Sequence, residues 1–221
     1  RPKETAVSFL IDGHTVTLGG ICKGSGMIHP SMATMLSYIT CDAGIDHVLW
    51  SSMIKRVADS YFNSITVDSD TSTNDSVIAF ATGLAGNKNN YSIDAKEMAS
   101  FCDAFERVMR DLAHQIVRDG EGASKFVEIK ISGAESNASA KAIGLKIANS
   151  PLVKTAIAGE DANWGRILAA VGRAPVEAFD VSRVVIDLGD VRLVENGGRA
   201  GSYTEAAGSA VMAEEEITIR I

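Results

Sequence analysis

The sequence predicts an α/β protein in which helices pack on sheets. Its clearest element is a helix over residues 94–118, where apolar side chains recur every three or four positions along one face. Shorter segments that alternate apolar and polar residues predict strands on both sides of this helix. Helical and strand patterns then follow each other along the chain, an order that is typical of α/β architecture.

Turn and capping residues place the other elements. Asp12-Gly13 separates two alternating segments within residues 6–18, which predicts a β-hairpin. Asp46 precedes a helical pattern that reaches about Phe62, and its side chain can cap that helix. Further strands are expected at residues 34–40, 64–67, 126–131, 184–188, 191–194 and 217–221, and further helices at residues 138–148, 163–170 and 204–212. The glycine-rich segment 19–26 is expected to be a loop, and the apolar segment 76–84 to be a buried helix or strand.

Length and composition restrict the class of protein. The 221 residues suffice for one large domain or two small ones, and with 46% hydrophobic and 22% charged residues the chain has the balance of a soluble globular protein. A net charge of -7 without any basic run argues against a nucleic-acid partner. Three irregularly spaced cysteines indicate neither disulfides nor a CxxC metal site, which fits a reducing compartment.

No segment suggests targeting to a membrane. The chain lacks a run of about 18 to 20 apolar residues that could span a bilayer, and its first residues lack the apolar region of a signal peptide. We therefore expect a soluble, cytoplasmic protein. Because the first residue is arginine and not methionine, we expect the natural product to begin upstream.

Several segments contain residues that could do chemistry. Gly24-Ser25-Gly26 beside Lys23 could bind a phosphate, but the segment lacks the P-loop pattern and a turn is favoured. The four histidines show no spacing typical of metal ligands, so no metal site is expected. The acidic run of residues 68–75 weakly resembles a calcium loop, yet it lacks the required glycine and glutamate, which favours a hydrogen-bonded turn.

Two further residues stand in unusual surroundings. Thr34 lies in an apolar run after the glycine-rich segment, although by itself it is an ordinary strand threonine. Glu121 lies between Gly120 and Gly122 just after the long helix, where a solvated turn is the ordinary interpretation. Flanking glycines would also let a carboxylate approach a ligand closely.

Four segments together resemble the ornithine acetyltransferase family, the glutamate N-acetyltransferases of the cyclic arginine pathway. They are KGSGMIHPSMATML at residues 23–36, NSITVDSDTSTND at 63–75, DGEGASK at 119–125 and NSPLVKTAIAGEDANWGR at 149–166. The resemblance covers essentially the whole chain. It implies mixed sheets layered with helices, in the self-processing fold of the ornithine acetyltransferase and DmpA type.

The resemblance also implies that the precursor cuts itself between Ala33 and Thr34. Residues 1–33 would then end the α chain and residues 34–221 would form most of the β chain, in an α2β2 assembly. Independently of the resemblance, the pattern becomes strand-rich beyond Pro175, so we expect a subdomain change near residue 175. A threonine hydroxyl is a weak nucleophile, and the α-amine freed by the cut, with a reference pKa near 8, would supply an adjacent base. The location would be cytoplasmic, or mitochondrial in a fungus.

By the same resemblance, the reaction is ping-pong acetyl transfer without a cofactor. Thr34 takes the acetyl group of N-acetylornithine and passes it to glutamate, while bifunctional members also use acetyl-CoA. Lys23, Thr34 and Glu121 match positions that bind substrate. Their charges suit an amino acid, which carries both a carboxylate and an ammonium group. We expect the three residues to converge on one pocket.

Some family features are missing from the chain. The Thr-Gly pair of the oxyanion hole, a substrate-contacting threonine before Arg1, and a C-terminal Asn with Thr or Ser lie outside it. Loss of oxyanion donors costs roughly 10²–10³ in rate, so the chain by itself is expected to be an incomplete enzyme. Two alternatives remain: a related N-terminal-nucleophile aminopeptidase or amidohydrolase, and an inactive fragment of the enzyme.

Overall fold

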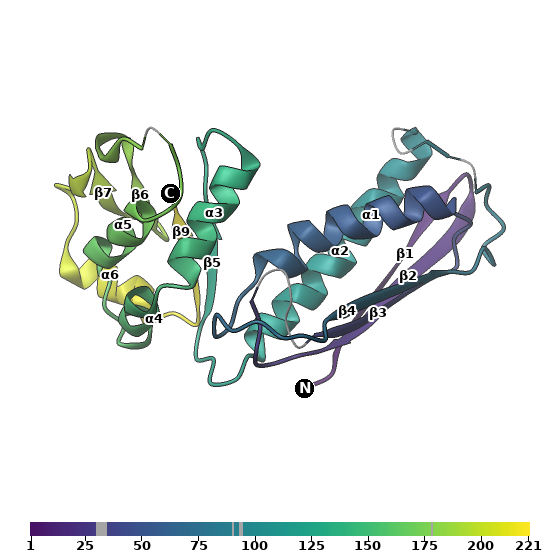
Figure 1. Cartoon of the computed structure of the whole chain (residues 1–221), viewed down its shortest axis with the longest axis horizontal. Coiled ribbons are helices and arrows are strands. Elements are labelled where there is room, and N and C mark those ends of the chain that lie inside the picture. Colours follow the sequence, from purple (N-terminus) through teal and green to yellow (C-terminus); the bar gives the residue numbers. More distant parts are fainter. Residues whose placement is uncertain (30–34, 90, 93–94, 178) are drawn as a thin grey trace. The chain divides into compact units, whose positions relative to one another are not determined.

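The chain folds into two compact units, Arg1–Glu121 and Gly122–Ile221. The computed structural model describes residues 1–29, 35–89, 91–92, 95–177 and 179–221. Each unit contains one sheet with helices packed on it and has its own hydrophobic core (Figure 1). The predicted α/β class is confirmed. The units divide after Glu121, whereas residue 175, near which a subdomain change was expected, lies inside the second unit.

The first unit is built on a sheet of four strands in the order β1-β2-β3-β4. Its strands are β1 Lys3–Ile11, β2 His14–Lys23, β3 Leu36–Cys41 and β4 Ser76–Ala81. The first three are antiparallel neighbours, and β4 is parallel to β3. The predicted hairpin is confirmed, because Asp12 and Gly13 both have positive φ, 50° and 77°, as a two-residue type I′ turn requires. The expected start of β3 at Thr34 lies outside the described residues.

The prediction of a loop over residues 19–26 is wrong for its first half, because Gly19 and Gly20 lie inside β2. A Cβ atom on Gly20 would stand 2.6 Å from Ile39 Cδ1 and 2.9 Å from Leu112 Cδ1. Glycine is therefore needed where a helix closely approaches the sheet, and it does not mark a turn here.

The prediction of a strand at residues 64–67 is also wrong. A short 3-10 helix, η1 Phe62–Ser64, occupies its start, and the following residues bind the loop before the cleavage segment. The Val67 N–H donates to the Ile28 carbonyl at 2.8 Å, and the Thr66 hydroxyl donates to the same oxygen at 3.1 Å.

Two helices cover one face of this sheet (Figure 1). In α1 His47–Ser60, the Asp46 carboxylate accepts the N–H groups of Val48 and Leu49 at 2.9 and 3.1 Å, which confirms the predicted cap. The long helix α2 Lys96–Arg118 confirms the strongest periodic pattern of the sequence. Within the described residues no helix is both long and apolar enough to cross a membrane.

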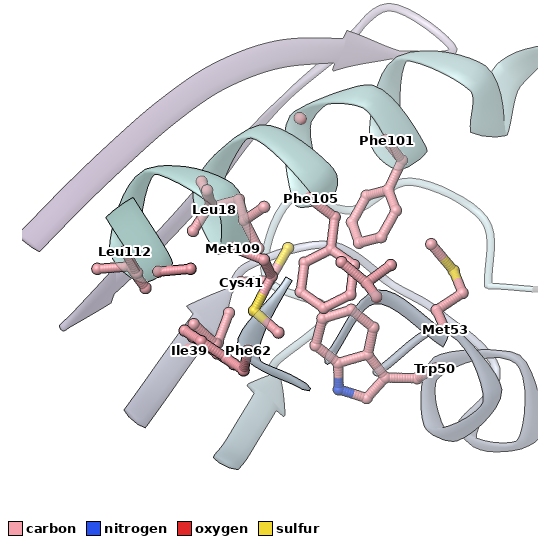
Figure 2. Close-up of a cluster of buried hydrophobic side chains, with 14 of the residues drawn as sticks. Leu18, Ile39, Cys41, Trp50, Met53, Phe62, Phe101, Phe105, Met109 and Leu112 are labelled. Atoms are coloured by element: carbon pink, nitrogen blue, oxygen red, sulfur yellow. The ribbon is translucent and has the colours of Figure 1, made fainter. Parts of the chain in front are cut away.

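The core of the first unit lies between these helices and the sheet (Figure 2). Phe101 and Phe105 of α2 are fully buried, and the Trp50 ring of α1 lies 5.0 Å from that of Phe105. The strands contribute Leu18, Ile39 and Cys41 to the same cluster. Burial of each large apolar side chain stabilises the fold by about 1.5–3 kcal/mol, so this cluster fixes α2 and the chain that leaves its end.

The second unit has a sheet of five strands in the order β5-β9-β6-β7-β8. The strands are β5 Phe126–Lys130, β6 Ile186–Leu188, β7 Val191–Glu195, β8 Gly198–Arg199 and β9 Glu216–Arg220, and the helices are α3 Asn137–Ala148, α4 Pro151–Ala158, α5 Trp164–Gly172, η2 Val181–Arg183 and α6 Glu205–Met212. The strands and helices predicted after residue 122 are all confirmed within a few residues. Helix α4 was missed, although Ser150 and Pro151 are a helix-start signal.

Two glycines in helices of the second unit are expected to respond oppositely to alanine. At Gly144 in α3 the nearest atom to an added Cβ is 3.7 Å away, so Gly144→Ala should raise the free energy of unfolding by up to about 1 kcal/mol. At Gly208 in α6 the Cβ would stand 2.7 Å from Ala162 Cβ and 2.9 Å from Tyr203 Cε2. Gly208→Ala should therefore lower that free energy by about 1–3 kcal/mol. Urea unfolding followed by circular dichroism measures both changes, and two changes of the same sign would contradict this packing.

Candidate active site

The residues beside the predicted cleavage point define the candidate site. Ala33 and Thr34 lie outside the described residues, but Met35, the next residue, is buried. Its N–H donates to the Asp75 Oδ1 atom at 2.7 Å, and its carbonyl accepts the Ser76 N–H at 3.0 Å. The N–H and the carbonyl of the residue after Thr34 are thus both bound by Asp75 and Ser76, at the start of β4.

A pocket of about 350 Å³ lies along the same part of the first unit. It is lined by Ile28, His29, Met35, Ala58, Phe62, Asn63, Ile65, Asp75, Ser76 and Val77. The walls are mainly apolar, with a few polar groups that include the Asp75 carboxylate. This volume falls in the range of small-molecule sites. His29 and Met35, on either side of the cleavage segment, both line the pocket.

Lys23 lies beside the cleavage segment because of the register of the sheet. It is the last residue of β2 and pairs with Leu36 of β3, two residues after Thr34. Lys23 is an exposed residue. The cation is therefore available to a ligand at this end of the sheet.

Glu121 is fixed against the loop that follows Lys23. Its N–H donates to the Ser25 carbonyl at 2.7 Å. Its carboxylate lies over Gly26, where an added Cβ would stand 2.7 Å from Glu121 Oε2. Glu121 thus lies at the loop of residues 24–28, which begins directly after Lys23 although the two residues are far apart in the sequence. Whether Thr34 joins them stays a prediction.

Asp68, which the sequence analysis did not single out, shapes this loop. Its carboxylate accepts the N–H groups of Met27 at 2.6 Å and Ile28 at 3.2 Å. Met27 has a φ of 52°, a conformation that side chains rarely adopt, and the bond to Asp68 helps to hold it. Asp68 Oδ2 would also stand 3.6 Å from a Cβ on Gly26, so a second carboxylate lies near Glu121.

The acidic segment 68–75 is accounted for by such hydrogen bonds. Asp68 and Asp75 each accept backbone N–H groups of the segment before β3. Asp68 also accepts the Asp70 N–H at 3.1 Å, as expected for a hydrogen-bonded turn. Among the described residues, no group of three or more His, Cys, Asp or Glu side chains could hold a metal ion.

The two glycines beside Glu121 differ: Gly120 serves packing, whereas Gly122 has open space beside it, and room there for a ligand stays a prediction. A Cβ on Gly120 would stand 3.0 Å from Val67 Cγ1 and 3.1 Å from the Val117 carbonyl. Nearby, the buried Lys3 ammonium lies 2.5 Å from an Asp119 carboxylate oxygen. This hydrogen bond lowers the pKa of Asp119 and ties the end of α2 to β1.

The cysteines of the first unit are poor alternatives to a threonine nucleophile. Burial raises the pKa of Cys22 and of Cys41 to about 11. Both are therefore thiols at neutral pH, whereas the thiolate is the reactive form. Burial also raises the pKa of Cys102.

Several motif residues of the second unit have structural roles. The Lys125 ammonium contacts the Glu160 carboxylate at 3.0 Å and the Glu214 carbonyl at 3.1 Å. Asn163 caps α5 by accepting the Arg166 N–H at 3.1 Å, and the Arg166 guanidinium donates to the Leu152 carbonyl at 3.0 Å. These contacts join separate segments of the second unit. The residue types at Lys125, Asn163 and Arg166 are therefore explained by the fold, without a ligand.

Comparison with known proteins identifies relatives over the whole chain. The ArgJ family model matches residues 1–221. Proteins named arginine biosynthesis bifunctional protein ArgJ are 51% identical over 223 residues in Brucella suis and 47% identical over 220 residues in Pseudomonas fluorescens, with 100% of this chain and 54% of each relative covered. The chain thus spans about half the length of these relatives. A crystal structure of the protein of that name from Bacillus halodurans has a TM-score of 0.79 and 38% identity, covering 85% of this chain and 88% of that chain.

Proposed function

Because the chain belongs to the ArgJ family, we propose that it carries the nucleophile of an acetyltransferase of arginine biosynthesis. In the full-length protein, Thr34 takes the acetyl group of N-acetylornithine and passes it to glutamate. The observation that carries this proposal is the placement of Lys23 and Glu121 at loop 24–28, beside the strand that follows Thr34. An amino-acid substrate has a carboxylate for the lysine and an ammonium group for the glutamate.

The same hydroxyl serves maturation and turnover in this proposal. The Thr34 oxygen attacks the Ala33 carbonyl carbon, and the peptide bond breaks to leave an ester and a free Thr34 α-amine. Water then hydrolyses the ester, which releases the Ala33 carboxylate and restores the Thr34 hydroxyl. That amine then accepts the hydroxyl proton while the oxygen attacks the acetyl carbonyl, and ornithine leaves as the amine. The amine of glutamate attacks the acetyl ester next, which releases N-acetylglutamate and restores the hydroxyl.

We place the cut of the precursor at the bond between Ala33 and Thr34. The cut chains would form an α2β2 assembly in the cytoplasm, and the oxyanion donors would come from the part of the protein outside this chain. The relatives are named bifunctional, and we propose acetyl-CoA as a second acetyl donor for this protein.

Labelled substrate tests the proposed chemistry. Full-length protein incubated with N-acetylornithine that carries a labelled acetyl group should yield one labelled peptide, beginning at Thr34, and labelled N-acetylglutamate once glutamate is added. Mass spectrometry measures both. Label released as acetate regardless of glutamate would favour the amidohydrolase alternative. A protein that is never cut and binds no label would favour the inactive fragment.

A further inference from the structure

We propose that Asp75 is a positioning residue for Thr34, holding the peptide that follows the nucleophile and stabilising the ammonium form of the α-amine that cleavage frees. This inference rests on the proposed role of Thr34. Asp75 lies 41 positions after Thr34 in the sequence and reaches the site only because β4 is parallel to β3.

The first part of the argument is the hydrogen bond to the adjoining peptide. The Met35 N–H that Asp75 accepts at 2.7 Å belongs to the peptide group whose other end is the Thr34 Cα atom. Because a peptide group is planar, fixing this N–H fixes the plane in which that Cα lies. The Ser76 N–H bond to the Met35 carbonyl, at 3.0 Å, fixes the next peptide. Asp75 and Ser76 thereby hold the backbone of the residue that directly follows the threonine.

The second part is the distance to the freed amine. The nitrogen atoms of successive residues are at most about 3.7 Å apart, whatever the backbone conformation. With 2.7 Å from Asp75 Oδ1 to the Met35 nitrogen, the carboxylate oxygen lies within roughly 6.5 Å of the Thr34 α-amine. A negative charge at such a distance favours the protonated, positively charged form of the amine.

The surroundings of Asp75 strengthen this interaction. Asp75 is partly buried and lines the apolar pocket, and desolvation raises its pKa while the bond from the Met35 N–H opposes that rise. Charges that are partly removed from water are less screened. Among the described residues, the other charged or titratable groups that these contacts place near the site are His29 in the same pocket, Lys23 opposite Leu36, and Asp68 with Glu121 at loop 24–28. Asp68 and Glu121 bond to residues 25–28, whereas Asp75 bonds to the peptide that adjoins Thr34.

Asp75→Asn in the full-length protein tests the proposal, because asparagine keeps the acceptor oxygen and removes the charge. The base must be neutral to accept the hydroxyl proton, so activity rises as pH passes the pKa of the amine. Without the nearby carboxylate that pKa falls. The acid limb of kcat/KM for acetyl transfer should therefore move to lower pH by about half a pH unit or more.

Asp42→Asn is the matched control. Asp42 accepts the Thr17 N–H at 2.7 Å, the same kind of bond at the same length, but at the opposite end of β3. Its substitution should leave the pH profile unchanged. His29→Gln controls for titration of the histidine and should leave the Asp75 effect in place.

An acid limb that is the same in Asp75→Asn and wild type would overturn the proposal, while an inactive Thr34→Ala protein would show that the nucleophile assignment still stands. If Asp75→Asn is not cut, Asp75→Glu replaces it, since glutamate keeps the charge but displaces the carboxylate by one methylene. Transfer should then fall about tenfold in Asp75→Glu and stay normal in Asp42→Glu. Normal rates in both would overturn the positioning role.

Discussion

Replacement of Thr34 by alanine in the full-length protein is expected to leave the chain uncut and to lower acetyl transfer at least about 10³-fold. The reason is that one oxygen atom forms the bond to carbon in both reactions, so its removal leaves neither an ester at Ala33 nor an acetyl ester. Denaturing gel electrophoresis and intact mass report the cut, and N-acetylglutamate formation reports the transfer.

Thr34→Ser is the matched variant, since it keeps the hydroxyl and loses only the methyl group that restricts the side-chain rotamer. It should retain part of both activities. Ser25→Ala tests the nearest described hydroxyl in the motif and should change neither, because Ser25 contributes its backbone carbonyl to Glu121. An active Thr34→Ala protein, or an acetyl group on Ser25 or a cysteine, would refute the proposed nucleophile without affecting family membership.

Local patterns predicted most of the elements because each depends on residues close together in the sequence. The apolar stripe of α2, the Asp46 cap of α1 and the Asp12-Gly13 turn are such cases. The four motifs likewise pointed to Lys23 and Glu121, which the structure places at one loop.

Other features depend on contacts between distant segments and could not be predicted from local patterns. Position 20 of β2 requires glycine because Leu112 of α2 packs directly over it. The expected strand at residues 64–67 is absent because that segment bonds to Ile28. Asp68 and Asp75 stand in a polar run that resembles any solvated turn. Their acceptor roles follow from the segments placed beside them, residues 27–28 and Met35.

Substitution of Glu121 by glutamine is expected to lower kcat/KM for N-acetylornithine roughly 10- to 100-fold, the effect of losing one charge-assisted bond to a substrate ammonium group. Gln keeps the size of the side chain and the backbone N–H that binds Ser25, so the cut before Thr34 and the unfolding midpoint should change little. Steady-state kinetics with each substrate measures the effect. A wild-type kcat/KM in Glu121→Gln would exclude an electrostatic role for the carboxylate.

Gly26→Ala tests the Glu121 carboxylate in a second way, by displacing it and not by removing its charge. The added methyl group would stand 2.7 Å from Glu121 Oε2, the mobile end of a side chain, and 3.6 Å from Asp68 Oδ2. The carboxylate must therefore move while the backbone stays in place, and KM should rise severalfold with little loss of stability. Because both substitutions act on one group, the double variant should be hardly worse than Glu121→Gln alone. If the two effects multiply instead, Gly26 acts on the substrate by itself and the position of Glu121 over this loop does not matter for binding.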